Sequence, residues 1–133
     1  MSRSVLVVED YADLCSAIVD TLARGEYVCE SASSADDAIG KLREHHYEAI
    51  LLAPTMPVRS DPVMRFLTES QPAEIHKVIL MTGPPIGEEA DPEDCRVLVK
   101  PFNNEQLFAQ LRPLTADAVN RLRTPRLEIL RRP

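Results

Sequence analysis

Short apolar runs alternate along this chain with segments in which apolar residues recur at helical spacing. Runs of this kind occupy residues 5–8, 49–52, 78–81 and 97–99, and a weaker one covers 27–31. An uninterrupted apolar run favours a strand covered on both faces, as in a parallel sheet, because a strand with one wet face would alternate apolar and polar residues. The pattern therefore predicts five strands.

Two helices are predicted before the middle strand. Residues 11–24 place apolar side chains three and four positions apart, and Gly25 follows as a C-terminal stop. The second helix begins after Ser34, which with Asp37 three residues later resembles a capping box, and it should end near His45.

Two further helices have start signals of the same kind. Asp61 or Ser60 is expected to cap a helix whose first residue is Pro62, where a missing backbone donor costs little. Asn103 or Asn104 is expected to cap the last one.

Strands that alternate with helices over short loops imply right-handed crossovers and an α/β fold. We expect a three-layer α/β/α sandwich of the flavodoxin-like type, with a five-stranded parallel sheet in the order 2-1-3-4-5. The 133 residues suffice for one domain. We assign it to residues 1–114 and treat residues 115–133 as a basic, partly helical C-terminal extension.

Charge is divided unevenly between these two parts. Residues 1–114 hold 10 Lys/Arg and 19 Asp/Glu, a net charge of −9, whereas residues 115–133 hold 5 and 2, a net charge of +3. An acidic body argues against nonspecific nucleic-acid binding, which needs clustered cations, and we expect no DNA-binding domain. The extension has two interpretations, a solvated or packed continuation of the last helix and a docking segment for an acidic partner surface.

Cysteine usage and hydropathy bear on the compartment. Cys15, Cys29 and Cys95 show no metal-type spacing and cannot all pair, which favours a reducing setting. No apolar stretch approaches the ~18 residues of a membrane span, and no apolar signal core precedes the first strand. We expect a cytoplasmic protein without membrane contact.

Polar residues that end the predicted strands supply the candidate chemistry. In the order 2-1-3-4-5 the chain reverses direction between strands one and three, and ligands of such sheets bind there, outside the C-terminal strand ends. Glu9 and Asp10 end the first strand, position 53 the third, Thr82 the fourth and Lys100 the fifth. All of them are expected on one rim of the sheet.

In order and spacing these landmarks resemble the receiver domains of bacterial response regulators, over residues 3–114. The resemblance is carried by Glu9-Asp10, Met56-Pro57, Thr82-Gly83 and Lys100-Pro101-Phe102. It implies a module of two-component phosphorelay signalling. In that family the acidic pair helps hold Mg²⁺, an Asp three residues before the Met-Pro accepts a phosphoryl group from a histidine kinase, and the Thr and Lys contact that group. Signalling proteins such as a histidine kinase or a downstream effector are the implied partners, and no enzymatic activity is expected.

The phosphoacceptor position holds Ala53. An acyl phosphate requires a carboxylate oxygen that attacks phosphorus, and a methyl group has no lone pair. We therefore predict that the chain is not phosphorylated at this position. Of the implied metal ligands Glu9, Asp10 and the carbonyl of Thr55 remain, so we expect no cofactor beyond weak or vestigial Mg²⁺ binding.

Two further departures from the receiver pattern concern switching. The switch position three residues before Lys100 is usually aromatic in the family and is Val97 here. Only 17 residues separate Thr82 from Lys100, where the family has a whole helix and two loops. They include Pro84, Pro85, Gly87 and Pro92. We expect that fourth helix to be short, distorted or absent, and with it part of the face that receivers use to dimerise, although a homodimer stays among the allowed assemblies.

The same residues have plainer interpretations. Glu9-Asp10 is also compatible with a solvated loop, although two acids at the end of a buried apolar strand favour a site remnant. Thr82 and Lys100 are explained equally well as strand-end residues, with Lys100 paired to Asp10, and as remnants with an anion or partner role. The sequence leaves that second choice open.

Three functional hypotheses remain. The first is an atypical single-domain receiver that acts through protein contacts without phosphorylation. The second is a conventional phosphoacceptor receiver in which Ala53 is an engineered replacement for Asp; Val97 and the shortened segment after Thr82 argue against it, since one designed change would not produce them. The third is an enzyme or cofactor binder on the same fold, but a flavodoxin-like phosphate site needs backbone donors after the first strand, where Glu9-Asp10 offers repulsion.

Overall fold

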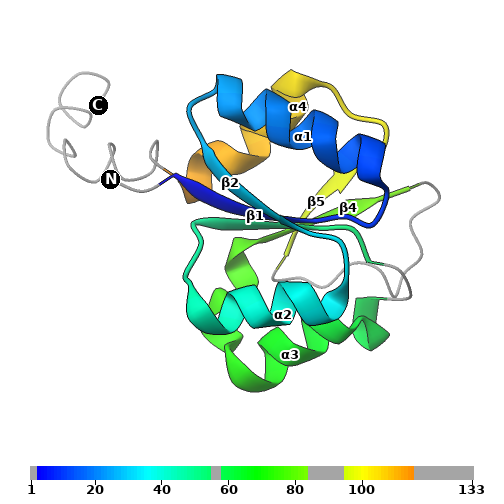
Figure 1. The fold of residues 1–133 in the computed structure, drawn as a ribbon, viewed down its shortest axis with the longest axis vertical. Helices are drawn as coiled ribbons and strands as arrows, with labels where there is room; N and C mark the ends of the chain where they lie inside the picture. Colours follow the sequence, from blue (N-terminus) through cyan, green and yellow to red (C-terminus); the bar gives the residue numbers. More distant parts are fainter. Residues whose placement is uncertain (1–2, 55–57, 84–94, 116–133) are drawn as a thin grey trace, which may run out of the picture.

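The computed structural model describes residues 3–54, 58–83 and 95–115, in which strands alternate with helices (Figure 1). The strands are β1 Ser4–Val8, β2 Val28–Ala32, β3 Ala49–Leu52, β4 Val78–Thr82 and β5 Arg96–Val99. The helices are α1 Ala12–Arg24, α2 Ala35–Glu44, α3 Pro62–Ser70 and α4 Asn104–Leu111. Short 3₁₀ turns cover Val58–Ser60, Pro72–Lys77 and Arg112–Leu114.

The strands form one parallel sheet in the order β2-β1-β3-β4-β5, which confirms the predicted topology. Helices α1 and α4 cover one face and α2 and α3 the other, so the molecule is the expected three-layer sandwich (Figure 1). A separate apolar cluster fills each of the two helix–sheet interfaces. Strands β1, β3 and β4 are almost entirely buried, which explains their uninterrupted apolar sequences.

Strand boundaries differ from the prediction by single residues. In the interior of the sheet, β1 begins at Ser4 and not at position 5, and β4 ends at Thr82 and not at position 81. β2 begins at Val28 and not at position 27, and β5 begins at Arg96 and not at position 97. Both are edge strands with partly exposed side chains. Their apolar pattern is therefore weaker, but the error at their ends is no larger than in β1 and β4.

Side-chain caps fix where three helices begin. The Ser34 hydroxyl accepts a hydrogen bond from a backbone N–H of α2, the buried carboxylate of Asp61 accepts two from α3, and Asn103 forms a capping box in α4. Of the predicted alternatives, Asp61 and Asn103 are thus the caps. Only half of the predicted box at α2 forms, because the carboxylate of Asp37 pairs with Lys41.

Helix α1 ends where predicted. The glycine that follows it is needed to make room for a neighbouring side chain, and not to adopt a left-handed backbone conformation. Gly25 has an ordinary φ of −88°, whereas Glu26 adopts the positive φ of 69°. The N–H groups of Glu26 and Tyr27 then close the helix end on carbonyls of its last turn. A Cβ at position 25 would lie 2.7 Å from Cε1 of Phe108, so the glycine permits the close approach of α1 and α4.

Two expectations lie outside the described residues. The segment expected to hold the shortened fourth helix of the receiver pattern falls largely within residues 84–94, and the basic extension assigned to residues 115–133 lies outside except for Thr115. The helix labelled α4 is the one predicted after Asn103. Within the described part of the chain, no helix is long and apolar enough to cross a membrane.

Replacing Glu26 by Gly should raise the free energy of unfolding by about 0.5–1 kcal/mol, because glycine adopts a positive φ without steric cost. Urea unfolding followed by circular dichroism measures the change. The Glu26→Ala variant is the matched control, since it removes the same side chain but keeps the Cβ, and it should show no comparable gain. Equal stabilisation by both changes would show that charge, and not backbone strain, is the cause.

Candidate functional site

The predicted strand-end residues lie together at the C-terminal edge of the sheet. The N–H of Ala53 donates to the carbonyl of Val8 at 2.9 Å, which places position 53 beside the end of β1. The N–H of Lys100 donates to the carbonyl of Thr82 at 2.6 Å, which joins the ends of β4 and β5. Glu9 follows directly on β1. The topology therefore brings Glu9, Ala53, Thr82 and Lys100 to one edge.

Glu9 is a buried carboxylate whose two oxygens both have partners. Its side chain is 2% exposed, and its Oε1 accepts a hydrogen bond from Nζ of Lys100 at 3.0 Å. Its Oε2 accepts a second bond from the backbone N–H of Tyr11 at 3.1 Å. A buried carboxylate without a counter-charge would cost several kcal/mol. The Lys100 ammonium is therefore what makes the burial of Glu9 tolerable.

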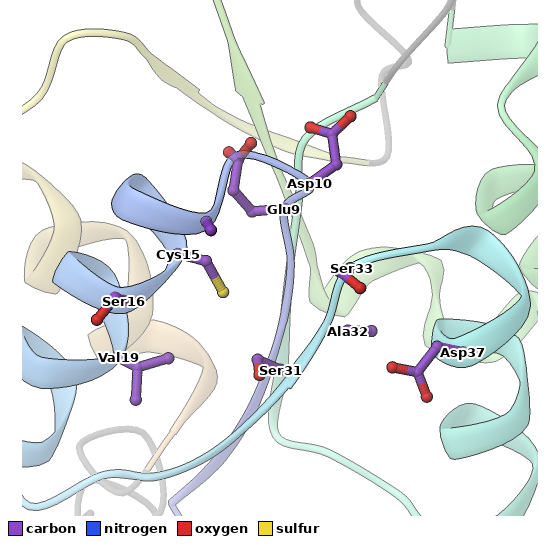
Figure 2. A pocket seen from close by; sticks show the side chains of 10 residues that line it. Glu9, Asp10, Cys15, Ser16, Val19, Ser31, Ala32, Ser33 and Asp37 are labelled. Atoms are coloured by element: carbon purple, nitrogen blue, oxygen red, sulfur yellow. The ribbon is translucent and has the colours of Figure 1, made fainter.

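Asp10 is exposed and takes no part in this ion pair. Figure 2 shows the two carboxylates apart from each other, that of Glu9 on the side of α1 and that of Asp10 on the other side of the strand end. Of the two acids, only Glu9 makes an ion pair with Lys100. The alternative in which Lys100 pairs with Asp10 is therefore wrong, because Glu9 is the partner.

Ala53 is half-buried and packs against the apolar cluster beneath α1 and α4. It borders a cavity of about 40 Å³. The polar residues around this cavity are Asp10, Ser33, Ser34 and Asp61. Asp61 uses its Oδ1 to cap α3. Position 53 has no side-chain oxygen, so this cavity has no nucleophile at the end of β3.

Thr82 contributes a hydroxyl group that lacks a partner. The residue is 9% exposed, and its Oγ1 makes no hydrogen bond within the described part of the chain. Buried hydroxyl groups are almost always hydrogen-bonded. Thr82 therefore has an unused hydrogen-bonding group on the same edge as Lys100.

The predicted switch position, Val97, is half-buried in β5 and lies opposite Leu80 of β4. Its carbonyl accepts a hydrogen bond from the Gln110 amide of α4 at 3.3 Å. A short branched side chain has no ring or polar tip to move between a buried and an exposed position. The carbonyl of Thr55, the third predicted metal ligand, lies outside the described residues.

The described residues do not fit a strong Mg²⁺ site. Mg²⁺ prefers an octahedral set of oxygen ligands that includes one or two carboxylates. Each oxygen of Glu9 already accepts a hydrogen bond, one of them from the Lys100 ammonium, whose charge opposes a cation there. The side chain of Ala53 offers no oxygen, and Asp10 is the remaining carboxylate of the acidic pair. In residues 3–54, 58–83 and 95–115, no group of three or more His, Cys, Asp or Glu is placed to hold a metal ion. Lys100 supplies the positive charge at this edge instead.

A larger pocket of about 450 Å³ lies beside this edge, over the end of β2. Figure 2 shows Cys15, Ser16 and Val19 of α1 on one side of it and Asp37 of α2 on the other. Burial raises the pKa of the Cys15 thiol, against a smaller opposing effect of its hydrogen bond with Ser31. The thiol therefore stays protonated at neutral pH and is a poor nucleophile.

Sequence reasoning missed the small cavity and this larger pocket. The cavity depends on Asp61, which the sequence marked only as a helix cap, and on Ser33 and Ser34. The pocket depends on residues of α1 and β2 that carry no motif. The only sequence feature that could have indicated these lining residues is their place in the chain, near the C-terminal ends of β1 and β2.

No family model and no curated protein matches the chain. Solved structures do match it in fold. The receiver domain of a response regulator from Bermanella marisrubri is 26% identical with a TM-score of 0.72, over 86% of this chain and 98% of that one. The chemotaxis protein CheY4 of Vibrio cholerae is 23% identical with a TM-score of 0.69, over 86% and 99% of the two chains.

A third neighbour is the receiver domain of a sensor histidine kinase from Pseudomonas aeruginosa, which coordinates a magnesium ion in its active-site cleft. It is 20% identical with a TM-score of 0.72, over 86% of this chain and 98% of that one. The structural neighbours are thus response-regulator receiver domains, and this chain has their fold, as the sequence landmarks predict.

Replacing Lys100 by Met should lower the free energy of unfolding by about 1–3 kcal/mol, because it leaves the Glu9 carboxylate buried without its counter-charge. The loss should be smaller than for a fully buried pair, since the Lys100 side chain is 30% exposed. Urea unfolding measures it.

The Lys41→Met variant is the matched control. Lys41 pairs with Asp37 at 2.9 Å and is also 30% exposed, but the Asp37 side chain is 46% exposed. Its loss should cost at most about 0.5 kcal/mol. The double change Glu9→Gln with Lys100→Met should recover part of the stability lost at Lys100. Equal losses for the two lysines would contradict the argument from burial.

Millimolar Mg²⁺ should change the melting temperature little, because the oxygens of Glu9 are already engaged and Ala53 supplies none. Scanning calorimetry at constant ionic strength, with Na⁺ as the reference, measures the shift. A large upward shift specific to Mg²⁺ would overturn this assessment of the site.

Proposed function

We propose that the chain is an atypical receiver-like module of two-component or phosphorelay signalling that acts through protein contacts and is not phosphorylated at position 53. One observation carries the proposal: the residue directly after β3 is Ala53, whose side chain is a methyl group. It lies on the same edge of the sheet as Thr82 and Lys100. The receiver fold of the structural neighbours supports the signalling context.

The first support for this function is chemical. Phosphoryl transfer to a receiver forms an acyl phosphate, for which a carboxylate oxygen must attack phosphorus. Ala53 has no such oxygen, and Asp10 and Asp61, which share its cavity, lie on other elements. Asp61 is committed to the cap of α3. The geometry therefore favours a module without a phosphoacceptor on β3.

The second support is that the buried negative charge at the C-terminal edge of the sheet already has a positive partner. In receivers, as the resemblance implies, the Lys contacts the phosphoryl group. Here Lys100 is held by Glu9, and Val97 provides no aromatic switch. We infer that the module keeps one state, and that its partners recognise a constant surface.

The implied partners are signalling proteins, a histidine kinase or a downstream effector. The net charge of −9 on residues 1–114 disfavours a nucleic acid as partner of this part. We assign the module to residues 1–114 and the basic extension to residues 115–133. We infer that any docking role for an acidic partner surface belongs to that extension, which carries a net charge of +3.

The proposal is tested by incubating the protein with acetyl phosphate and Mg²⁺ and measuring its intact mass. No phosphoryl adduct is expected on the native chain, whereas a conventional receiver treated in parallel should be modified. Beryllium fluoride with Mg²⁺ should likewise leave the NMR signals of Thr82 and Lys100 unchanged. An adduct on any side chain of the native protein would refute phosphorylation independence.

The Ala53→Asp variant separates the proposal from the engineered alternative. If Ala53 were the only altered residue of a conventional receiver, restoring Asp should return full phosphorylation and a large Mg²⁺-dependent response. We expect at most slow modification without propagated NMR shifts, because Val97 and the Glu9–Lys100 pair remain.

A further inference from the structure

The opposite, N-terminal edge of the sheet holds a pocket lined by two arginines and two aromatic rings. Its volume is about 270 Å³. The lining residues are Arg3, Gly25, Tyr27, Phe108 and Arg112. They come from the residue before β1, the end of α1, the residue before β2, and the end of α4 with the turn that follows. The pocket is therefore remote from Ala53.

Arg3 has an unsatisfied donor in this pocket. Its guanidinium carbon lies 4.4 Å from the centre of the Tyr27 ring. Its Nε is buried and makes no hydrogen bond within the described part of the chain. A buried, charged N–H without an acceptor is costly, and such groups are rare in folded proteins. An oxygen acceptor that reached this N–H after a shift of the Arg3 side chain would remove that cost.

The two arginines also lack a counter-charge. Among the described residues, neither Arg3 nor Arg112 takes part in an ion pair. Glu26 lies in the adjacent turn, but it is exposed and pairs with neither. Arg112 is exposed and Arg3 is half-buried, so water screens part of the repulsion between their guanidinium groups, and a bound anion would relieve the remainder.

The aromatic wall is held in place by contacts of its own. The rings of Tyr27 and Phe108 stack with centroids 6.0 Å apart. The Tyr27 hydroxyl shares a buried hydrogen bond of 3.1 Å with Oγ1 of Thr115. Because this wall does not depend on a ligand for its order, binding there would require little rearrangement.

Helix capping does not account for the arginines. The last-turn carbonyls of α1 already accept backbone N–H groups of Gly25, Glu26 and Tyr27. Carbonyls at the end of α4 accept from Thr115, at 2.9 Å from its hydroxyl and 3.3 Å from its N–H. The two helix dipoles add only about half a negative charge each, less than the two full positive charges.

We propose that this pocket binds an oxyanion carried on an apolar or aromatic group. The carboxylate or phosphate lies between Arg3 and Arg112, and the attached group packs against Tyr27 and Phe108. The same chemistry is available from a free small ligand and from a carboxylate of the chain's own residues 116–133, and the test separates these two sources.

The probes are sodium benzoate, sodium acetate and inorganic phosphate. Each is titrated into the full chain at constant ionic strength, and the NMR signals of the Gly25, Tyr27 and Phe108 amides report binding. Benzoate should give saturable shifts and bind more tightly than acetate, which lacks the ring. The Arg3→Gln and Arg112→Gln variants should each weaken benzoate binding about tenfold. Arg3→Lys should retain part of the affinity, since it keeps the charge but not the fork of donors.

The Arg24→Gln variant is the matched control, because Arg24 is an exposed arginine at the same end of α1 that does not line the pocket. It should bind benzoate like the native chain. If a carboxylate of the chain occupies the pocket, Asp117→Asn or Glu128→Gln should strengthen benzoate binding severalfold. The proposal would be overturned if Arg24→Gln weakened benzoate binding as much as Arg3→Gln and Arg112→Gln do. It would also be overturned if neither the native chain nor the Asp117→Asn and Glu128→Gln variants bound benzoate saturably.

Discussion

The buried carboxylate of Glu9 needs a counter-charge, and Lys100 supplies it. This ion pair holds together the C-terminal edge of the sheet. β1 lies inside the sheet between β2 and β3, so the residue that follows it is covered on both sides. The N–H of Glu9 bonds to the carbonyl of Ala32 at 3.1 Å, which fixes its backbone, and its side chain is 2% exposed. Lys100, 91 residues later, reaches across from β5. The ion pair thus ties the end of a central strand to that of an edge strand.

The proposed function depends on this pair together with Ala53. With Ala53 at the end of β3, the edge has one carboxylate fewer, and a single lysine balances its buried charge. The hydroxyl of Thr82 keeps an unused hydrogen-bonding group nearby. In the proposed function, this edge keeps the strand-end arrangement of receivers without the group that reacts. Fold alone does not specify function, so the proposed signalling role rests on these particular side chains.

The two edges of the sheet differ in charge and in lining. The C-terminal edge carries Glu9, Asp10 and the acidic pocket shown in Figure 2. The N-terminal edge carries Arg3 and Arg112 beside stacked aromatic rings. Parallel strands cause this separation, because every strand starts at one edge and ends at the other. One small domain therefore offers two surfaces that differ in their side chains.

The sequence by itself determined the strands, the described helices, the sheet order and the absence of a side-chain oxygen at position 53, and it narrowed two of the helix caps to a pair of candidates each. These features depend on local periodicity and on residue identity, which a chain shows without its partners in space. Strand boundaries were off by one residue in central strands such as β1 as well as in edge strands such as β2, because a backbone ladder extends past the apolar run that marks a strand.

Only the tertiary structure decided which side chains meet. It showed that Lys100 pairs with Glu9 and not with Asp10, that Gly25 makes room for Phe108, and that Arg3 shares a pocket with Arg112. Each of these contacts joins segments far apart in the chain, and each depends on the direction of a side chain and on distances set by packing. Spacing along the sequence does not encode such distances, so they become visible only once the layers are assembled.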